Sequence, residues 1–154
     1  MATAGDPDSA QARLREVLAE LVTNTSRFTR LASSIGTDDR PRTWMRALSH
    51  LDEYGELRIS EFARVDRCSQ PTATALLKQL TDAGLAVRRR DPEDSRAVVV
   101  EMTEAGRRWL AEARQEIGEA LAGHLPGLDT EQVERLSRSL ADLRAAIKSS
   151  TATR

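Results

Sequence analysis

The chain has 154 residues, a length typical of one domain or of one subunit of an assembly. Its composition, 40% apolar and 31% charged, is that of a globular protein. The net charge is −1, so the overall charge does not indicate a particular kind of partner. The single cysteine excludes an intrachain disulfide, and no apolar run is long enough to span a membrane. The first residues, MATAGDPDSAQ, carry acids where a signal peptide needs bases, so we expect a cytoplasmic protein with a disordered tail at residues 1–9.

Two helices are predicted in the first third of the chain. Between Asp8 and Ser34, apolar residues recur at three- and four-residue spacing, which is the period of one helix face. Gly36 and the sequence TDDRP end this pattern. A second amphipathic pattern predicts a helix from about Arg42 to Glu53, which Gly55 ends.

The next segment, ELRISEFARVDRCSQPTATALLKQLTDAGLAVRRR, predicts two helices joined by a tight turn. Its predicted elements are an extended stretch at Leu57–Ile59, a helix at Glu61–Val65 capped by Ser60, and a helix from Gln70 to about Ala83 capped by Ser69. Pro71 falls in the first turn of the second helix, where its missing N–H costs nothing. Gly84 ends that helix.

Two Val-rich stretches, Ala86–Arg90 and Ala97–Glu101, predict a hairpin around the turn DPEDS. A helix–turn–helix followed directly by a hairpin is a winged helix. In such a fold the second helix enters the major groove of DNA, and the hairpin touches the adjacent backbone or minor groove. Two more helices are predicted, from Thr103 to about Leu121 and from Asp129 or Thr130 onward.

Positive charge is concentrated in the winged-helix segment. Residues 64–90 hold six basic and two acidic side chains, a net charge of +4, so the rest of the chain carries −5. The apolar stripe of the second helix leaves an outward face made of Gln70, Pro71, Thr74, Ala75 and Lys78. Glutamine pairs with adenine, threonine contacts the thymine methyl group, and lysine meets phosphate or guanine. An ordinary solvated helix face is the alternative, but the segregated charge favours DNA contact.

The predicted hairpin adds further candidates. Arg88 and Arg90 share one face of their strand, and Arg89 faces away, so Arg89 is left out of the expected contacts. Arg96 is expected near the turn. Asp94 is expected to accept a hydrogen bond from its guanidinium and to orient it. Asp91 and Pro92 are expected to form the turn itself.

From Ile59 to Gly106 the sequence resembles the MarR (multiple-antibiotic-resistance regulator) family. The resemblance is carried by SQPTATALLKQL, LTDAGLAVRRR, VEMTEAG and, most specifically, the wing motif Asp-Pro-x-Asp-x-Arg-Ala. The resemblance implies homodimeric repressors that bind palindromic operators. It also implies that small aromatic or phenolic ligands, or oxidants, release these repressors from DNA. The residues that match the family's wing pair and the start of its recognition helix are Asp94, Arg96, Ser69, Pro71, Thr72 and Thr74.

We therefore expect a mainly α protein with a small β-hairpin wing. A winged helix–turn–helix DNA-binding region is assigned to residues 40–103, and an interleaved helical dimerisation region to residues 10–35 and 104–148. Its apolar stripes are wider than one winged-helix core can cover, which motivates a dimer. The residues expected to be buried between two subunits are Leu14, Leu18, Leu121, Leu128, Leu136, Leu140 and Ile147.

The family's usual ligands suggest an aromatic acid, held by an arginine between apolar walls. The candidate ligand-binding residues are Arg13, Arg42, Trp44, Arg46 and Trp109. Tryptophans at helix spacing are also typical of an ordinary core, so both interpretations of Trp44 and Trp109 stay open.

Cys68 also has two interpretations. It precedes a helix N-cap and neighbours Arg64 and Arg67, which lower a thiol pKa and favour a redox sensor. A free cysteine is otherwise a small buried apolar residue. A winged-helix module that binds protein instead of DNA is a further alternative. The sequence contains no recognisable catalytic constellation, cofactor motif or metal-ligand spacing, so we expect neither an enzyme nor a bound cofactor or metal.

Overall fold

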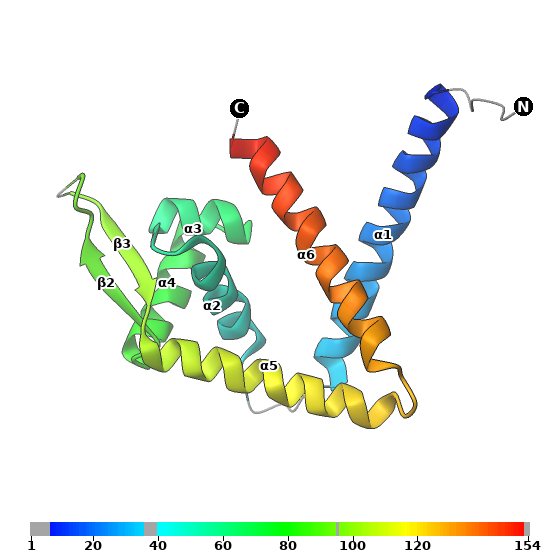
Figure 1. Ribbon diagram of the computed structural model, residues 1–154. Helices are drawn as coiled ribbons and strands as arrows, with labels where there is room; N and C mark the ends of the chain where they lie inside the picture. Colours follow the sequence, from blue (N-terminus) through cyan, green and yellow to red (C-terminus); the bar gives the residue numbers. More distant parts are fainter. Residues whose placement is uncertain (1–6, 36–39, 95, 153–154) are drawn as a thin grey trace, which may run out of the picture. The chain divides into compact units, whose positions relative to one another are not determined.

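The computed structural model describes residues 7–35, 40–94 and 96–152 (Figure 1). The elements follow the predicted order: α1 (Pro7–Ile35), α2 (Arg42–Tyr54), β1 (Leu57–Arg58), α3 (Ile59–Asp66), α4 (Gln70–Asp82), β2 (Ala86–Arg90), β3 (Val98–Met102), α5 (Glu104–His124) and α6 (Thr130–Ala152). Contacts divide the chain into two units, one ending at Leu121 and the other beginning at Ala122. The prediction of a mainly α protein with a hairpin wing is confirmed.

Helices α2, α3 and α4 and the small sheet enclose one apolar core. Phe62 of α3 is fully buried, as are Leu48 of α2, Leu77 of α4 and Val100 of β3. The predicted inward stripe of α4 is confirmed, since all four of its members are buried: Ala73, Leu76, Leu77 and Leu80. This core fixes the orientation of α4 and therefore determines which side chains its outer face presents.

The sheet has the antiparallel order β1-β3-β2, with β3 in the centre. Val100 faces Leu57 on one side and Arg88 on the other. Strand β3 begins at Val98, one residue later than predicted, because Ala97 belongs to the turn. The Ala97 N–H donates to the carbonyl of Asp94 at 2.9 Å, and the Ala97 carbonyl accepts from Asp91 at 3.0 Å.

The predicted cap of α3 is wrong. The helix begins at Ile59, so Arg58, and not Ser60, is the N-cap residue. The carboxylate of Glu61 accepts the backbone N–H of Arg58 at 2.8 Å. A glutamate at the third helical position that reaches back in this way satisfies a donor that the first turn leaves free.

Helix α5 starts in direct contact with the end of the α4 segment. The backbone N–H of Thr103 donates to the carbonyl of Leu85 at 3.0 Å. A Cβ atom added to Gly106 would lie only 2.1 Å from that carbonyl oxygen. Gly106 is therefore required by close approach of the backbone, and this contact sets the direction in which α5 leaves the winged helix.

Helix α1 begins at Pro7, so residues 7–9 of the predicted tail are helical, and residues 1–6 lie outside the described residues. Proline suits the first helical position because its fixed φ is already helical. Apolar side chains on α1 remain exposed: Leu14, Val17, Leu18, Val22 and Leu31. Among the described helices, none combines the length and the apolar composition needed to cross a bilayer.

Candidate nucleic-acid interface and adjoining cavity

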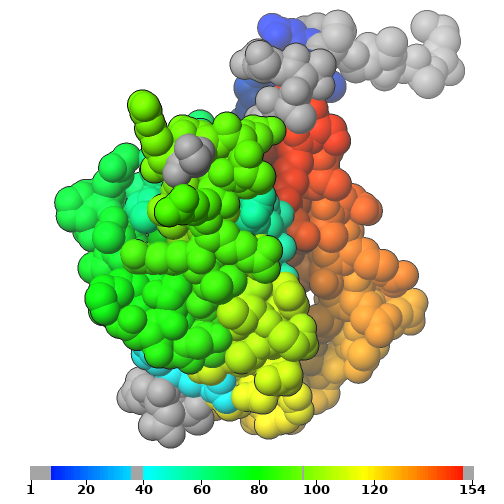
Figure 2. Space-filling model, turned by 90° about the vertical axis from the view of Figure 1, so that its left-hand side faces the viewer, coloured from blue at the N-terminus to red at the C-terminus, as the bar shows by residue number. Residues whose placement is uncertain are grey.

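The outer face of α4 is held in place by its first turn. The Ser69 hydroxyl accepts the backbone N–H of Thr72 at 3.3 Å and lies 2.8 Å from the Thr72 hydroxyl. Ser69 is thus the N-cap, as predicted. The predicted outward side chains are all exposed: Gln70, Pro71, Thr74, Ala75 and Lys78. In Figure 2, the hairpin and the adjoining part of the winged helix form one continuous green surface toward the viewer.

Two contacts modify what α4 presents. The ammonium group of Lys78 pairs with Asp82, one turn further along, at 2.6 Å, and both side chains are exposed. This exposed pair is weak and readily exchanged for a phosphate. On the opposite flank, the indole N–H of Trp44 donates to the Gln79 side chain at 3.1 Å, which joins α2 to α4.

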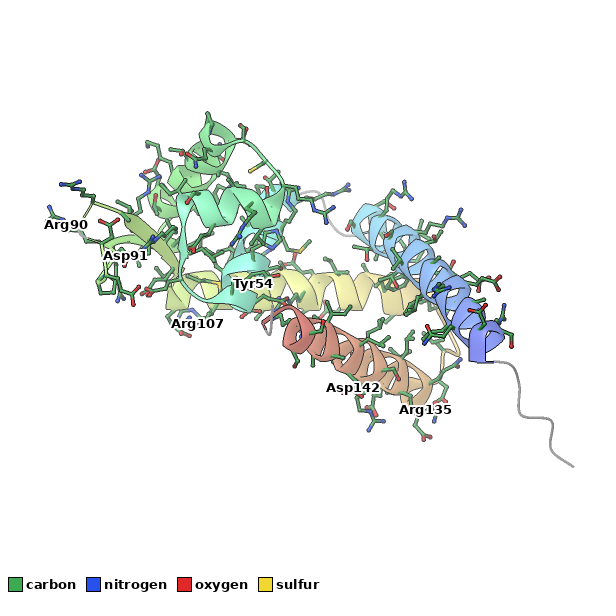
Figure 3. The ribbon with its side chains drawn as sticks, turned by 90° about the horizontal axis from the view of Figure 1, so that it is seen from above. Tyr54, Arg90, Asp91, Arg107, Arg135 and Asp142 are labelled. Atoms are coloured by element: carbon green, nitrogen blue, oxygen red, sulfur yellow. The ribbon has the colours of Figure 1, made fainter. Side chains whose placement is uncertain are left out.

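The three arginines of β2 have different surroundings. Arg88 donates to the carbonyl of Thr74 at 3.4 Å, so it lies against α4. Arg89 pairs with Glu101 of β3. Arg90 has no ion-pair partner among the described residues, and its side chain extends outward from the hairpin (Figure 3). Arg88 therefore brings positive charge beside α4, Arg90 is exposed on the hairpin, and the charge of Arg89 is already paired.

The predicted pairing of Asp94 with the Arg96 guanidinium is wrong. The Asp94 carboxylate instead accepts the backbone N–H of Arg96 at 3.0 Å. Aspartate two residues before a backbone donor forms a local turn of this kind readily. Asp94 thus shapes the turn, and the exposed Arg96 side chain is not oriented by it.

Asp91 has a role that sequence reasoning missed. Its carboxylate is buried and accepts from Arg58 at 2.5 Å and from the backbone N–H of Glu93 at 2.8 Å. The hydrogen bond from Glu93 is the main cause that lowers the pKa of Asp91; burial opposes it, and Arg58 adds to it. The pair joins the base of the wing to β1. Asp91 and Arg58 are 33 positions apart, and no local pattern signals their contact.

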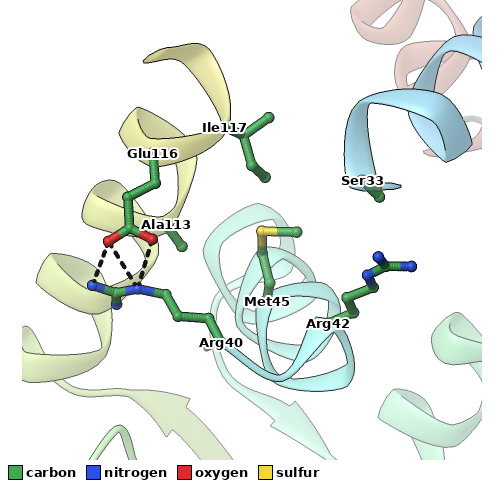
Figure 4. Close-up of a pocket in the computed structure, with 7 residues that line it drawn as sticks. All are labelled: Ser33, Arg40, Arg42, Met45, Ala113, Glu116 and Ile117. Atoms are coloured by element: carbon green, nitrogen blue, oxygen red, sulfur yellow. Dashed lines mark hydrogen bonds and ion pairs between the residues drawn. The ribbon is translucent and has the colours of Figure 1, made fainter. Parts of the chain in front are cut away.

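A cavity of about 550 Å³ lies beside the winged helix, within the range that small ligands occupy. Its residues come from α1, α2 and α5. The apolar part of the lining is Phe28, Ala32, Met45, Ile117 and Leu121, and the cationic part is Arg42, Arg46 and Arg114. A recess of about 30 Å³ shares Ser33, Arg42, Met45 and Ile117 with it, and the Arg40–Glu116 pair borders this recess (Figure 4).

The cavity contains two of the five predicted ligand residues, Arg42 and Arg46. Trp44 and Trp109 do not line it. Their rings pack against each other with centroids 6.1 Å apart, beside the core, and Arg40 stacks on Trp109. Of the two interpretations of these tryptophans, the structure favours packing beside the core.

Arg13 is also outside the cavity. It pairs with Glu16 on the exposed side of α1. Fifteen residues separate it from Phe28, the first cavity residue of that helix, which corresponds to roughly 22 Å of rise. Arg114, which the sequence reasoning missed, does line the cavity and pairs with Asp52 of α2 at 3.0 Å.

Of the two interpretations of Cys68, the structure favours the small, partly buried residue. Burial raises the pKa of the Cys68 thiol, and a hydrogen bond to Asp66 raises it further, while Arg46 acts in the opposite direction. The arginines adjacent in sequence, Arg64 and Arg67, are not among the causes. Burial and the carboxylate of Asp66 thus both oppose the low thiol pKa that a reactive thiolate needs.

Exposed side chains of α4 beside an arginine-bearing wing define the class of winged-helix DNA-binding proteins. A model of the MarR family matches residues 41–98. The chain is 33% identical over 116 residues to the HTH-type transcriptional repressor IacR of Pseudomonas putida, which covers 75% of this chain and 68% of IacR. It is 30% identical over 97 residues to the regulator YdgJ of Bacillus subtilis, spanning 63% of this chain and 57% of YdgJ.

Solved structures share the fold. Wild-type apo MarR of Escherichia coli superimposes with a TM-score of 0.63 at 20% identity, over 82% of this chain and 95% of MarR. Bordetella bronchiseptica BpsR, whose DNA binding is regulated by 6-hydroxynicotinic acid, gives a TM-score of 0.54 at 18% identity, over 81% of this chain and 98% of BpsR. The chain belongs to the MarR family of DNA-binding transcriptional regulators.

Proposed function

We propose that the protein is a homodimeric repressor that binds a palindromic operator and is released from it by a small aromatic carboxylate. One observation supports the DNA-binding part of the proposal. The polar face of α4 is exposed, and Arg88 of the wing lies against this helix. The residues assigned to the interface are Ser69, Gln70, Pro71, Thr72, Thr74, Lys78, Arg88, Arg90, Asp94 and Arg96, with Asp94 acting through the shape of the turn.

Each group of these residues suits a different part of the duplex. Gln70 and Thr74 stand in the first two turns of α4, the part of a recognition helix that reaches base edges. Arg90 and Arg96 are exposed on the hairpin, where guanidinium groups meet phosphates or the minor groove. Base contacts then supply specificity, and wing contacts supply affinity that depends on salt.

The dimer is supported by apolar faces that a single chain leaves uncovered. On α1, Leu14 is 54% exposed, and on α6, Leu136 and Ile147 are 58% and 65% exposed. A second copy is the proposed cover, with residues 10–35 and 104–148 as the dimerisation region and residues 40–103 as the DNA-binding region. Two recognition helices about 34 Å apart then reach successive major grooves, which requires a palindrome.

The ligand is supported by the chemistry of the cavity. Apolar walls with three arginines suit a flat apolar body that carries a carboxylate. The DNA binding of BpsR, a protein of the same fold, is regulated by the aromatic acid 6-hydroxynicotinic acid, which supports this choice of ligand class. A 100-fold loss of operator affinity requires that the ligand favour the released state by about 2.7 kcal/mol.

Selection of genomic fragments with the purified protein tests the proposal. We expect a palindromic site that overlaps a promoter, and an affinity that falls steeply as salt rises. A site upstream of the promoter would indicate an activator instead. Weak binding without sequence preference or salt dependence would contradict DNA regulation and favour a protein-interaction module.

A further inference from the structure

Arg46 of α2 belongs to two sites at once. It lines the cavity, and its guanidinium donates to both carboxylate oxygens of Asp66, from Nε to Oδ1 at 2.7 Å and from Nη2 to Oδ2 at 3.1 Å. Asp66 is the last residue of α3, and its side chain is fully buried, whereas that of Arg46 is 54% exposed. Arg46 therefore connects the open cavity with the buried start of the turn that leads into α4.

Asp66 organises that turn. Its carboxylate also lies 3.2 Å from Nε2 of His50 on α2. Next in the chain, Arg67 adopts a left-handed conformation with φ 55°, and the N–H of Cys68 donates to the carbonyl of Ala63 at 3.0 Å. Ser69, the N-cap of α4, follows immediately. A shift of Asp66 would thus be passed to the first turn of the recognition helix.

The Arg46–Asp66 pair is of a kind that is sensitive to competition. A buried carboxylate is tolerated when it is paired, and removal of its cation leaves a costly uncompensated charge. Arg46 can reach a cavity ligand with the same planar group that binds Asp66. A ligand carboxylate would be the chemical equal of Asp66, and arginine binds either one through two parallel hydrogen bonds.

We propose that Arg46 transmits occupancy of the cavity to the recognition helix. A carboxylate in the cavity takes hydrogen bonds of the guanidinium away from Asp66, and the turn before α4 loses its anchor. The inference rests on the proposed function, because it requires an anionic ligand at this site. It adds the residue through which the ligand acts.

The second ion pair of the cavity provides a matched control. Arg114 lines the same cavity and pairs with Asp52 at 3.0 Å. Asp52 lies on α2 and is 43% exposed, and it is not part of the turn before α4. Arg42, the third cationic residue of the lining, has no ion-pair partner among the described residues. Of the three, Arg46 is the one that reaches the turn.

The experiment uses benzoate as the probe and the DNA fragment obtained by selection. Operator affinity is measured by fluorescence anisotropy with and without benzoate, and benzoate affinity by calorimetry, for the native protein, Asp66→Asn and Asp52→Asn. Both substitutions free one cavity arginine, so both should bind benzoate more tightly. Only Asp66→Asn should bind the operator about tenfold more weakly without benzoate, and it should lose most of the benzoate response.

Arg46→Lys is the second variant, judged by the same two readouts if Asp66→Asn melts early. Lysine keeps the positive charge but cannot form the two parallel hydrogen bonds to Asp66. The substitution should therefore weaken operator binding and reduce the benzoate response. Native operator affinity in both Asp66→Asn and Arg46→Lys, or a full benzoate response in either, overturns the inference. If benzoate neither binds the native protein nor releases its operator, the ligand part of the proposed function fails together with the inference, and the DNA-binding part stands.

Discussion

The winged helix buries its apolar side chains, whereas the terminal helices α1 and α6 leave many of theirs exposed. Phe62, Leu48 and Leu77 are fully buried within the winged helix of one chain. Leu136 and Ile147 of α6, and Leu14 and Val22 of α1, are more than half exposed. Isolated helices gain little stability from propensity alone, and most helices depend on a packed face. The winged helix therefore buries its apolar core within one chain, whereas α1 and α6 leave the apolar faces that the proposed second copy would cover.

The ion pairs of the winged helix and of α6 also differ, because the former join distant elements and the α6 pair is local. Asp66 and Asp91 are buried carboxylates, each held by an arginine from another element. The Glu131–Arg135 pair of α6 is exposed and lies one turn apart on a single helix, where such pairs contribute only a few tenths of a kcal/mol. Long-range ion pairs fix the tertiary structure of the winged helix, whereas the local pairs of α6 keep its polar face solvated beside exposed apolar side chains.

The largest effect is expected from a charge on the apolar face of α6. Leu136→Glu should abolish the proposed dimer and, because one recognition helix then binds alone, lower operator affinity about 100-fold or more. Sedimentation at micromolar concentration and operator binding measure the two effects. Arg138→Glu, on the opposite face of α6, is the control and should remain dimeric. A dimeric Leu136→Glu protein would show that α6 is covered in another way.

The next effect concerns the winged helix alone. In Gly106→Ala the new methyl group would collide with the Leu85 carbonyl, so we expect a loss of about 3 kcal/mol in the free energy of unfolding. Gly118→Ala lies on the same helix, has no atom within 4 Å of the added Cβ, and should be neutral or stabilising by up to about 1 kcal/mol. Urea unfolding measures both. Equal effects would mean that the close approach of α5 to Leu85 is not needed.

A smaller effect separates two arginines of the wing. Arg96→Ala should cost roughly 1–3 kcal/mol of operator binding, because an exposed cation near DNA is lost. Arg89→Ala removes the same charge from a side chain already paired with Glu101, so its cost should be clearly smaller. Operator titrations at one fixed salt concentration compare them. Equal losses would place Arg89 at the interface.

The smallest effect is a dependence of winged-helix stability on acid. Burial raises the pKa of Asp66, but hydrogen bonds from Arg46 and Cys68 outweigh it, and the pKa is lowered overall. The pKa of Asp91 is lowered as well. A lowered pKa in the folded state contributes stability above the pKa of the unfolded chain, about 4, and this stability is lost as pH falls through the lower folded value.

Thermal unfolding between neutral pH and strong acid should therefore show a decline below about pH 4. Asp91→Asn should be less stable at neutral pH and should decline less steeply in acid, because one of the two carboxylates is missing. An unchanged slope in Asp91→Asn would show that the Asp91 carboxylate contributes nothing to the acid response.

Local pattern was sufficient to predict the elements, and contacts between distant elements were not predictable from it. The stripe of Leu76, Leu77 and Leu80 and the cap Ser69 are written within 12 residues, and both are confirmed. The Arg58–Asp91 pair joins positions 33 apart, and the Arg40–Glu116 pair joins positions 76 apart. An arginine looks the same in the sequence whether it pairs with a carboxylate or binds DNA. The partner of each arginine can therefore be identified only in the folded structure.

The alternatives that the sequence left open in the candidate sites have the same origin. The sequence neighbours of Cys68, Arg64 and Arg67, favour a thiolate, whereas its thiol responds to burial and to Asp66. Residue type alone does not distinguish a ligand wall from core packing for Trp44 and Trp109, whose rings pack against each other beside the core. Arg114 carries no motif and lines the cavity only because α5 packs beside α2. Sequence predicted the exposed face of α4 better than it predicted what surrounds the cavity.

The indole pair gives the protein an intrinsic optical reporter. Trp44 and Trp109 are the only tryptophans in the sequence, and the indole of Trp44 is bonded directly to Gln79 on α4. All tryptophan emission therefore originates beside the recognition helix. Movements of that helix can be followed in real time without a dye, with Gln79→Met as the variant that disconnects the signal.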